Sequence, residues 1–296
     1  MTHPKTDSSI ASKYYVPHSS YWPILGTIAL ALIAIGAANA LQNAAHGFPT
    51  LSLGLLVFAG TLFGWFGSVI KESLSGLYND QMDRSFRWGM AWFIFSEFMF
   101  FAAFFGALFY IRNVSLPWLG GFGDRGESNL LWPQFKATWP LLNNPNPELF
   151  GNIKHAMGAW GLPFINTLIL LSSGITVTWA HHGLRTKNQK ALTLGLFLTF
   201  MLGFIFLGLQ AYEYIHAYRD LDLKINHGIY GATFYMLTGF HGLHVLMGSI
   251  MLVIIWLRSL KHHFTPQKHF AFEAVAWYWH FVDVVWLFLF VFVYWI

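Results

Sequence analysis

Five residues that can hold or exchange a proton lie inside long apolar stretches of the sequence. They are Glu97, His241, His244, His280 and Asp283. An ionised carboxylate at the centre of a bilayer costs about 3 kcal/mol on insertion scales, so such residues face other protein, pair with one another or stay neutral. A spacing of three places His241 with His244, and His280 with Asp283, on single helix faces. We therefore expect the five residues to form a buried polar layer whose members satisfy one another.

Three kinds of chemistry compete at these positions. Intramembrane acids such as Glu97 and Asp283 are typical of proton relays, while paired histidines suit a metal and a single histidine can hold haem iron. The structural alternative is hydrogen bonding across helices, which the glycines around His241 and His244 favour because they permit close helix approach. For Glu97 we favour the structural alternative, since a single acid does not make a relay. We favour it for His241 and His244 as well, because polar packing already explains them. We predict neither a catalytic residue nor a metal ligand on this chain.

Two further groups lie at the ends of apolar stretches. His181 and His182 occur in WAHHGL, and Glu213 and His216 occur in LQAYEYIH. Their position predicts the membrane–water interface rather than a ligand site.

The elements that must position these residues are apolar and long. Seven stretches reach the roughly 20 residues that a helix needs to cross a bilayer. They are residues 22–41, 51–70, 88–111, 162–180, 191–211, 230–257 and 274–294. We see no internal repeat, and the pattern predicts an all-α membrane protein with seven transmembrane helices.

The two acids Glu97 and Asp283 are expected at the same depth in the membrane. Glu97 and Asp283 each lie nine residues past the start of their stretch, roughly 14 Å into the membrane at 1.5 Å per residue and near the middle of a ~30 Å core. The sixth stretch runs the opposite way and carries His244 to within a turn or two of that level. We therefore predict a hydrogen bond between Glu97 and His244.

Composition supports the membrane assignment. Charged residues make up 10% of the chain and hydrophobic residues 55%, and the mean hydropathy is +0.48, whereas soluble domains carry about 25% charged residues. The 17 Lys and Arg are spread through every loop, which argues against nucleic-acid binding. There is no Cys, which excludes disulfides, thiolate metal sites and cysteine nucleophiles.

The distribution of positive charge predicts the orientation. If the seven stretches alternate, eleven of the 17 Lys and Arg fall on one side and six on the other. Four of the six lie in the long segment 112–157, and long loops weigh less in this rule. We expect a cytoplasmic N-terminus and an external C-terminus. Segment 112–157 is rich in Asn, Pro, Gly and Trp, and we expect it to be functional, packed on a partner, or a partly ordered insertion.

Several motifs together resemble one family. WYWHFVDVVWLFLF, preceded by HHFTPQKHFAFEA, resembles the C-terminal signature of cytochrome c oxidase subunit III. VPHSSYWPILG, SEFMFFAAFF, PFINTLILLSSGITVTWAHHGL, LQAYEY and GIYGATFYMLTGFHGLHVLMGS resemble its earlier helices in the same order. In this comparison Glu97 takes the place of the family's buried acid.

The resemblance implies a fold and a set of partners. The family's fold is a two-plus-five bundle with a V-shaped lipid cleft, which here implies an N-terminal segment 1–21, a two-helix unit 22–70, a cytoplasmic loop 71–87 and a five-helix unit 88–296. The family carries no haem or copper itself. It packs on the catalytic haem–copper subunit among the other oxidase subunits, supports proton uptake and turnover stability in a proton-pumping enzyme of aerobic respiration, and binds phospholipids.

Lipid-binding residues are expected at helix ends. Lys71 and Arg258 end stretches on the cytoplasmic side, where cations meet phospholipid head groups, although both side chains could instead reach the interface without specificity. In the family these positions hold lipid, with Arg commoner at the position of Lys71. We add Trp65 as a third lipid-binding residue. Segment 112–157 is longer than in the family's shorter versions, and this departure and the N-terminus point to the bacterial inner (plasma) membrane, with a periplasmic C-terminus.

Two other functions stay open. A stand-alone proton-coupled membrane transporter would use Glu97 and Asp283 as its relay, but transporters often show repeats and broken helices. A membrane haem protein would use His241, His244 or His280.

Overall fold

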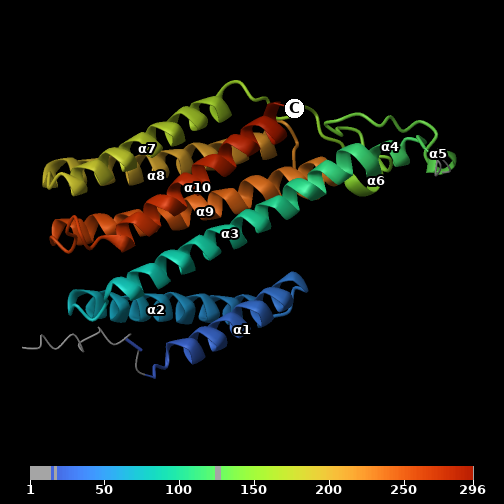
Figure 1. Ribbon diagram of the computed structural model, residues 1–296. Coiled ribbons are helices and arrows are strands. Elements are labelled where there is room, and N and C mark those ends of the chain that lie inside the picture. The colour runs from blue at the N-terminus through green and yellow to red at the C-terminus, as the bar shows by residue number, and fades with distance from the viewer. Residues whose placement is uncertain (1–14, 17–18, 124–127, 296) are drawn as a thin grey trace, which may run out of the picture. The chain divides into compact units, whose positions relative to one another are not determined.

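The regular structure is helical throughout the described residues. The computed structural model describes residues 15–16, 19–123 and 128–295, so most of the expected N-terminal segment 1–21 lies outside them. Seven helices are long and apolar enough to cross a membrane, which confirms the predicted fold class (Figure 1). They are α1 (Trp22–Leu41), α2 (Gly47–Leu74), α3 (Asp80–Tyr110), α7 (Leu162–Arg185), α8 (Gln189–Arg219), α9 (Gly228–Leu260) and α10 (Phe270–Leu289).

The helices extend further than the apolar stretches. The bounds of α1 match the prediction, but residues 71–87, expected as a loop, are helical except for the short stretch between Leu74 and Asp80. Hydropathy marks the part of a helix that lies in hydrocarbon, whereas the backbone hydrogen bonds continue into the interface. At the start of α3 the side chain of Asn79 accepts a hydrogen bond from the backbone of Met82 at 2.9 Å, which caps the helix beyond its apolar part.

Contacts divide the chain into two compact units, Met1–Phe86 and Arg87–Ile296. In the first unit α1 packs along α2. Ala29 is fully buried there, and the indole N–H of Trp22 donates to the hydroxyl of Ser68 at 3.3 Å. The first unit is therefore an antiparallel helix pair, whose short connection between Leu41 and Gly47 forces the reversal.

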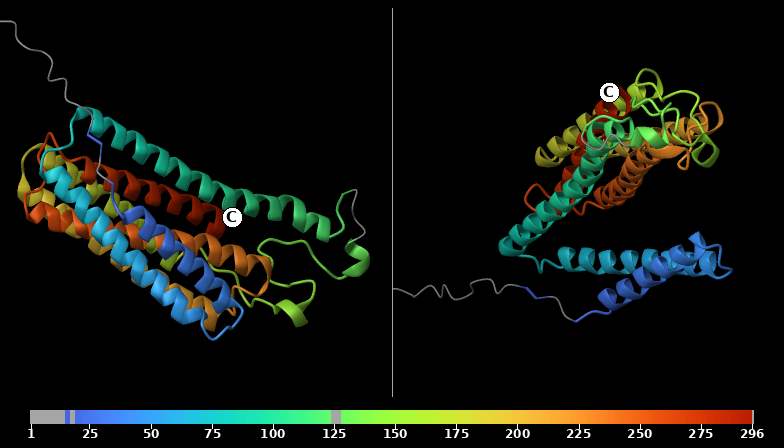
Figure 2. Two further views of the ribbon diagram at one scale, coloured as in Figure 1. Left: turned by 90° about the horizontal axis from the view of Figure 1, so that it is seen from below. Right: turned by 90° about the vertical axis from the view of Figure 1, so that its right-hand side faces the viewer.

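The second unit is a bundle built around α7, α8, α9 and α10. Each of these helices packs against the next, and α10 also packs on α7, as the views show (Figures 1 and 2). Two buried indoles tie α10 to α7: Trp279 donates to Ser173 and Trp286 donates to Thr167, both at 2.9 Å. These bonds satisfy the polar edge of each tryptophan inside an apolar core.

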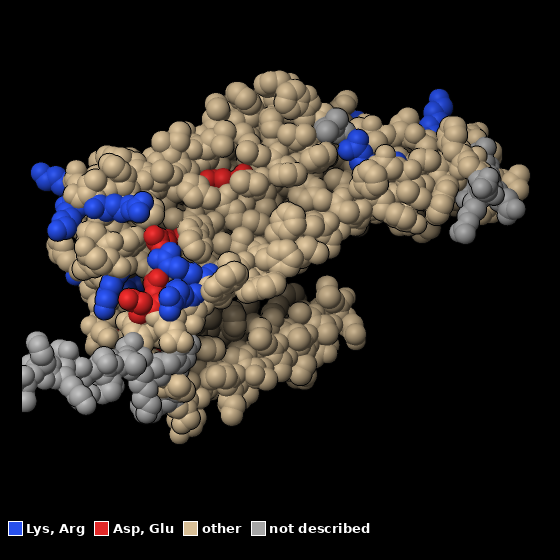
Figure 3. Space-filling model, viewed as in Figure 1, with Lys and Arg blue, Asp and Glu red and all other residues tan. Residues whose placement is uncertain are grey.

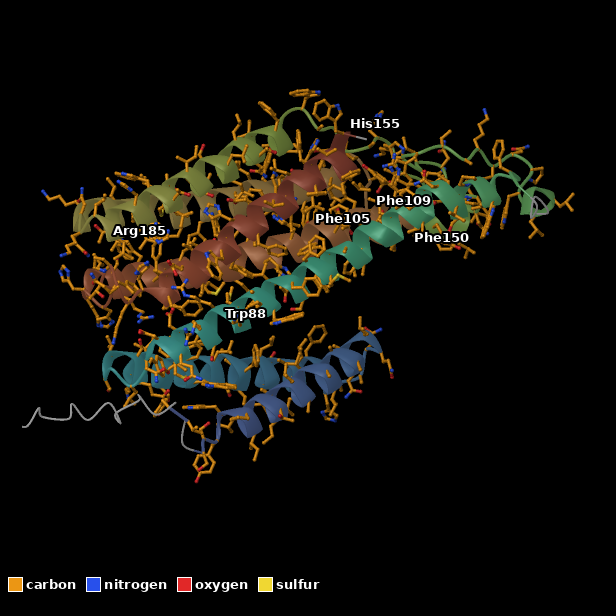
Figure 4. The ribbon with its side chains drawn as sticks, in the orientation of Figure 1. Trp88, Phe105, Phe109, Phe150, His155 and Arg185 are labelled. Atoms are coloured by element: carbon orange, nitrogen blue, oxygen red, sulfur yellow. The ribbon has the colours of Figure 1, made fainter. Side chains whose placement is uncertain are left out.

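Helix α3 joins this bundle through aromatic side chains. Phe93 stacks on Tyr278 of α10, with ring centroids 6.2 Å apart, and Phe100 meets Phe240 of α9 edge to face at 5.1 Å. Phe105 lies further along the same helix (Figure 4) and approaches the rings of α10 and the turn that follows it. Long side chains thus bridge α3 to α9 and α10 at the level of Glu97.

The segment that follows α3 packs on its own bundle. After a π-helical turn (Ile111–Ser115) come the short helices α4 (Leu116–Leu119), α5 (Ser128–Leu131) and α6 (Pro147–Phe150). The hydroxyl of Tyr230, near the start of α9, accepts from the backbone of Met157 at 3.2 Å, and its ring meets that of Trp139 edge to face. The described part of segment 112–157 is therefore anchored to one end of the five-helix unit.

Candidate functional site

The structure contains the predicted pair of Glu97 and His244. Oε2 of Glu97 on α3 lies 2.8 Å from Nε2 of His244 on α9. The other ring nitrogen of His244, Nδ1, donates to the carbonyl of Phe240 at 2.6 Å. With Nδ1 serving as a donor, the short contact on the other side needs a proton between the imidazole and the carboxyl group. The pair therefore holds a shared proton between two helices.

The surroundings of this pair are aromatic and largely dry. The side chains are 22% and 11% exposed for Glu97 and His244 respectively. The ring of Phe101 meets the imidazole edge to face at 4.9 Å, and Tyr278 stacks near it at 6.3 Å. His244 lies sixteen residues from each end of α9, so the contact sits at the middle of that helix.

A second pair lies between α10 and α7. Nδ1 of His280 lies 3.8 Å from Oδ2 of Asp283, and Nε2 lies 3.4 Å from the hydroxyl of Thr178. Asp283 is 7% exposed, and its Oδ1 has no hydrogen-bond partner among the described residues. The side chain of His280, by contrast, is 46% exposed.

His241 belongs to neither pair. It is 1% exposed, and its Nε2 donates to the carbonyl of Val282 at 3.2 Å. Its ring packs against Phe206 and Trp286, with centroids 5.7 and 5.1 Å away. The five residues expected in one layer thus occupy three places: a bridge from α3 to α9, a bridge from α10 to α7, and a histidine that fastens α9 to the backbone of α10.

The sequence did not predict the burial of one acid, Glu213. Glu213 was expected at the interface, but it is fully buried. Its Oε1 accepts from the hydroxyl of Tyr294 at 2.7 Å, and that hydroxyl accepts from Gln210 at 3.5 Å. Gln210 in turn accepts from Asn166 at 3.5 Å. The signal in the sequence was the spacing of three between Gln210 and Glu213, which puts two polar side chains on one face near the end of an apolar stretch.

His216, three residues after Glu213 on α8, is not buried. Its side chain is 43% exposed and lies 2.6 Å from Asp220.

One cluster has the composition of a cation site. Nε2 of His181, Nε2 of His269 and Oε1 of Glu273 lie 3.4, 3.6 and 3.2 Å from one another. Nδ1 of His269 donates to the carbonyl of Thr265 at 3.1 Å, which turns the Nε2 lone pair toward the other two atoms. These separations match the edge of a tetrahedron with bonds of about 2 Å. Arg87 already neutralises the same carboxylate at 2.5 Å, which weakens its charge for a cation.

Of the three expected lipid-binding residues, two lie in the first unit and one lies in the second. In the first unit, Trp65 is 41% exposed on α2 and Lys71 is exposed in the last turn of that helix. In the second unit, Arg258 lies in the last turn of α9, with its guanidinium carbon 4.7 Å from the centre of the Phe264 ring. On the face shown in Figure 3, Lys and Arg lie near helix ends rather than along their middle.

Comparison with known proteins gives one consistent result. A family model described as cytochrome c oxidase subunit III matches residues 12–122 and 146–296. The chain is 41% identical over 287 residues to cytochrome c oxidase subunit 3 of Heterololigo bleekeri, which covers 97% of this chain and 98% of that one. It is 40% identical to the same subunit of Dugong dugon, covering 95% and 96% of the two chains. The family model leaves residues 1–11 and residues 123–145 unmatched, and the second of these stretches falls in the segment after α3.

Proposed function

Because this chain belongs to the cytochrome c oxidase subunit III family, we propose that it is a non-redox core subunit of a proton-pumping cytochrome c oxidase. The observation that carries the proposal is the family match along nearly the whole chain. Its partners are other oxidase subunits, and the subunit that carries the haems and copper is the one on which it packs. In this role the chain contributes to proton uptake and to stability during turnover.

The geometry of the histidines supports a structural role for them. Both ring nitrogens of His244 are engaged, and the Nε2 of His241 donates to a backbone carbonyl. These bonds support a structural role for both rings, although Nδ1 of His241 is buried without a partner among the described residues. The transporter alternative is weaker, since Glu97 and Asp283 belong to separate pairs rather than to one relay.

The function is tested by removing the chain from the enzyme. We expect an oxidase that lacks the chain to begin oxygen reduction but to lose activity sooner during sustained turnover, with recovery when the chain is supplied again. Oxygen consumption followed over many turnovers in both preparations measures this. Equal lifetimes with and without the chain would contradict the proposed role.

Lipid binding is the second part of the proposal. Trp65, Lys71 and Arg258 supply the aromatic and cationic groups that phospholipid head groups meet at an interface. Replacing both Lys71 and Arg258 with Gln should lower the phospholipid that co-purifies with each oxidase complex, measured as phosphorus per haem. The matched control replaces Arg185 and Lys187, two exposed cations at the end of α7 and just after it, with Gln and should leave the ratio unchanged. An equal ratio in both double variants would sink the idea.

We also propose that the chain resides in the bacterial plasma membrane with its N-terminus in the cytoplasm and its C-terminus in the periplasm. The distribution of Lys and Arg supports this orientation.

A further inference from the structure

Helix α10 presents an outward stripe with one polar residue in its middle. Trp277, Val284, Leu287 and Phe288 are 37, 51, 36 and 52% exposed, and the side chain of His280 is 46% exposed. Their spacing of three and four places them on one face of the helix. The other members of the stripe are apolar, as a helix in a membrane allows.

His280 lies too deep for water or head groups to reach it easily. It is ten residues past Phe270, where α10 begins, which corresponds to roughly 15 Å at 1.5 Å per residue. That distance is about half of the ~30 Å hydrocarbon core. Within the chain, Nε2 of His280 has one long contact, 3.4 Å to Thr178, and Nδ1 lies 3.8 Å from Asp283, beyond hydrogen-bonding distance. Acyl chains offer neither donors nor acceptors, so lipid on this face would not satisfy the remaining ring nitrogen.

The buried carboxylate beside this histidine has one oxygen without a hydrogen bond among the described residues. Asp283 is one turn further along α10 and 7% exposed, yet its Oδ1 has no hydrogen bond in the described part of the chain. The facing residue on α7 is Gly174, where an added Cβ would lie 2.8 Å from Oδ2 of Asp283. The fold therefore makes room for this carboxylate while leaving one of its oxygens unsatisfied.

We propose that this stripe is the docking face for a transmembrane helix of another oxidase subunit, and that this helix donates a hydrogen bond to the exposed imidazole of His280, the outer member of the His280–Asp283 pair. The inference rests on the proposed function, which supplies the partner complex. The partner helix is apolar where it meets Val284 and Leu287 and carries a donor such as Ser, Thr or Asn at mid-depth. A second copy of this chain fits less well, because it would bring another carboxylate against Asp283.

Photo-crosslinking in the assembled oxidase tests the face. A benzophenone amino acid in place of Val284 should crosslink to another oxidase subunit in native membranes. The control is the same amino acid in place of Leu257, an outward residue of α9 that is 48% exposed, and it should not give that product. Crosslinks from position 284 to lipid alone, to a second copy, or to another segment of this chain would overturn the proposal.

A substitution tests the polar contact. His280→Leu should raise the fraction of chain that detergent releases from the haem-containing complex by about threefold to twentyfold, the range expected for one hydrogen bond between membrane helices. His216→Leu is the matched control, since that side chain is 43% exposed and lies on α8, and it should leave release unchanged. Equal release from both variants would contradict the contact. Should His280→Leu fail to accumulate in the membrane, the crosslink from position 284 decides the question.

The two proposals fail in different ways. If no haem co-purifies with the wild-type chain, the proposed function and this inference are both overturned. If haem co-purifies with the wild-type chain but position 284 gives no crosslink to another subunit, this inference alone is overturned.

Discussion

On α9, two histidines one turn apart bond in different directions. His244 reaches outward to an acid on another helix, whereas His241 reaches the backbone of α10 and is enclosed by aromatic rings. Each bond replaces water that these groups lose on burial, so each fixes the position of a neighbouring helix. At the residue scale the site therefore holds helices together, and its chemistry is the sharing of protons and hydrogen bonds.

The Glu97–His244 bond is open to direct test. Glu97→Ala leaves Nε2 of His244 in need of another partner, so we expect the free energy of unfolding to fall by ~1–3 kcal/mol. Denaturant or thermal unfolding of the purified complex measures the change. Initial oxygen reduction should persist, since no redox group is assigned to this chain. Glu148→Ala, at an exposed position, is the control. Undiminished stability would refute the contribution of the bond, and abolished initial oxygen reduction would show a direct catalytic role.

Some of these residues could be predicted from sequence and others could not. The Glu97–His244 bond followed from depth, because both residues lie near the middle of long apolar stretches. Glu213 was missed because its stretch ends soon after it, and hydropathy does not show that Tyr294, more than 80 residues away, covers it. The exposure of His280 was equally hidden, since which face of α10 points outward depends on packing against α7 and α9.

At the scale of elements, hydropathy gave the number and order of the spanning helices. Their ends were less predictable, because caps and charged first turns extend a helix beyond its apolar part. Helix α3, for example, begins with Asp80 and Asp83, whose carboxylates complement the positive end of the helix dipole. Within the five-helix unit, the contact of Arg87 with Glu273 shows that α3 and α10 begin at the same end.

The orientation of α9 provides a test at this scale. The chain has no Cys, so a single introduced thiol reports one position. A membrane-impermeant thiol reagent is applied to spheroplasts, whose plasma membrane is intact. We expect it to label Asn226→Cys, just before α9, and to leave Lys261→Cys, just after α9, unlabelled. Both should be labelled once the membranes are opened. The reverse labelling pattern in spheroplasts would contradict the predicted orientation of α9.

At the scale of the molecule, the two units make different contributions. The first is a helix pair with few buried residues, whereas the second contains the buried polar pairs and the aromatic core. In the second unit polar groups bond across helices, and the outward stripe on α10 carries His280, a polar group that these helices leave exposed.

The central claim is that this chain belongs to a haem-containing oxidase and carries no redox centre of its own. The most direct measurement is the optical spectrum and the haem and copper content of the affinity-tagged chain, taken first in its complex and again after separation from its partners. We predict haem and copper in the complex, and neither in stoichiometric amount on the separated chain. A Soret band or copper that stays with the separated chain, or a mildly purified complex without haem, would contradict the account.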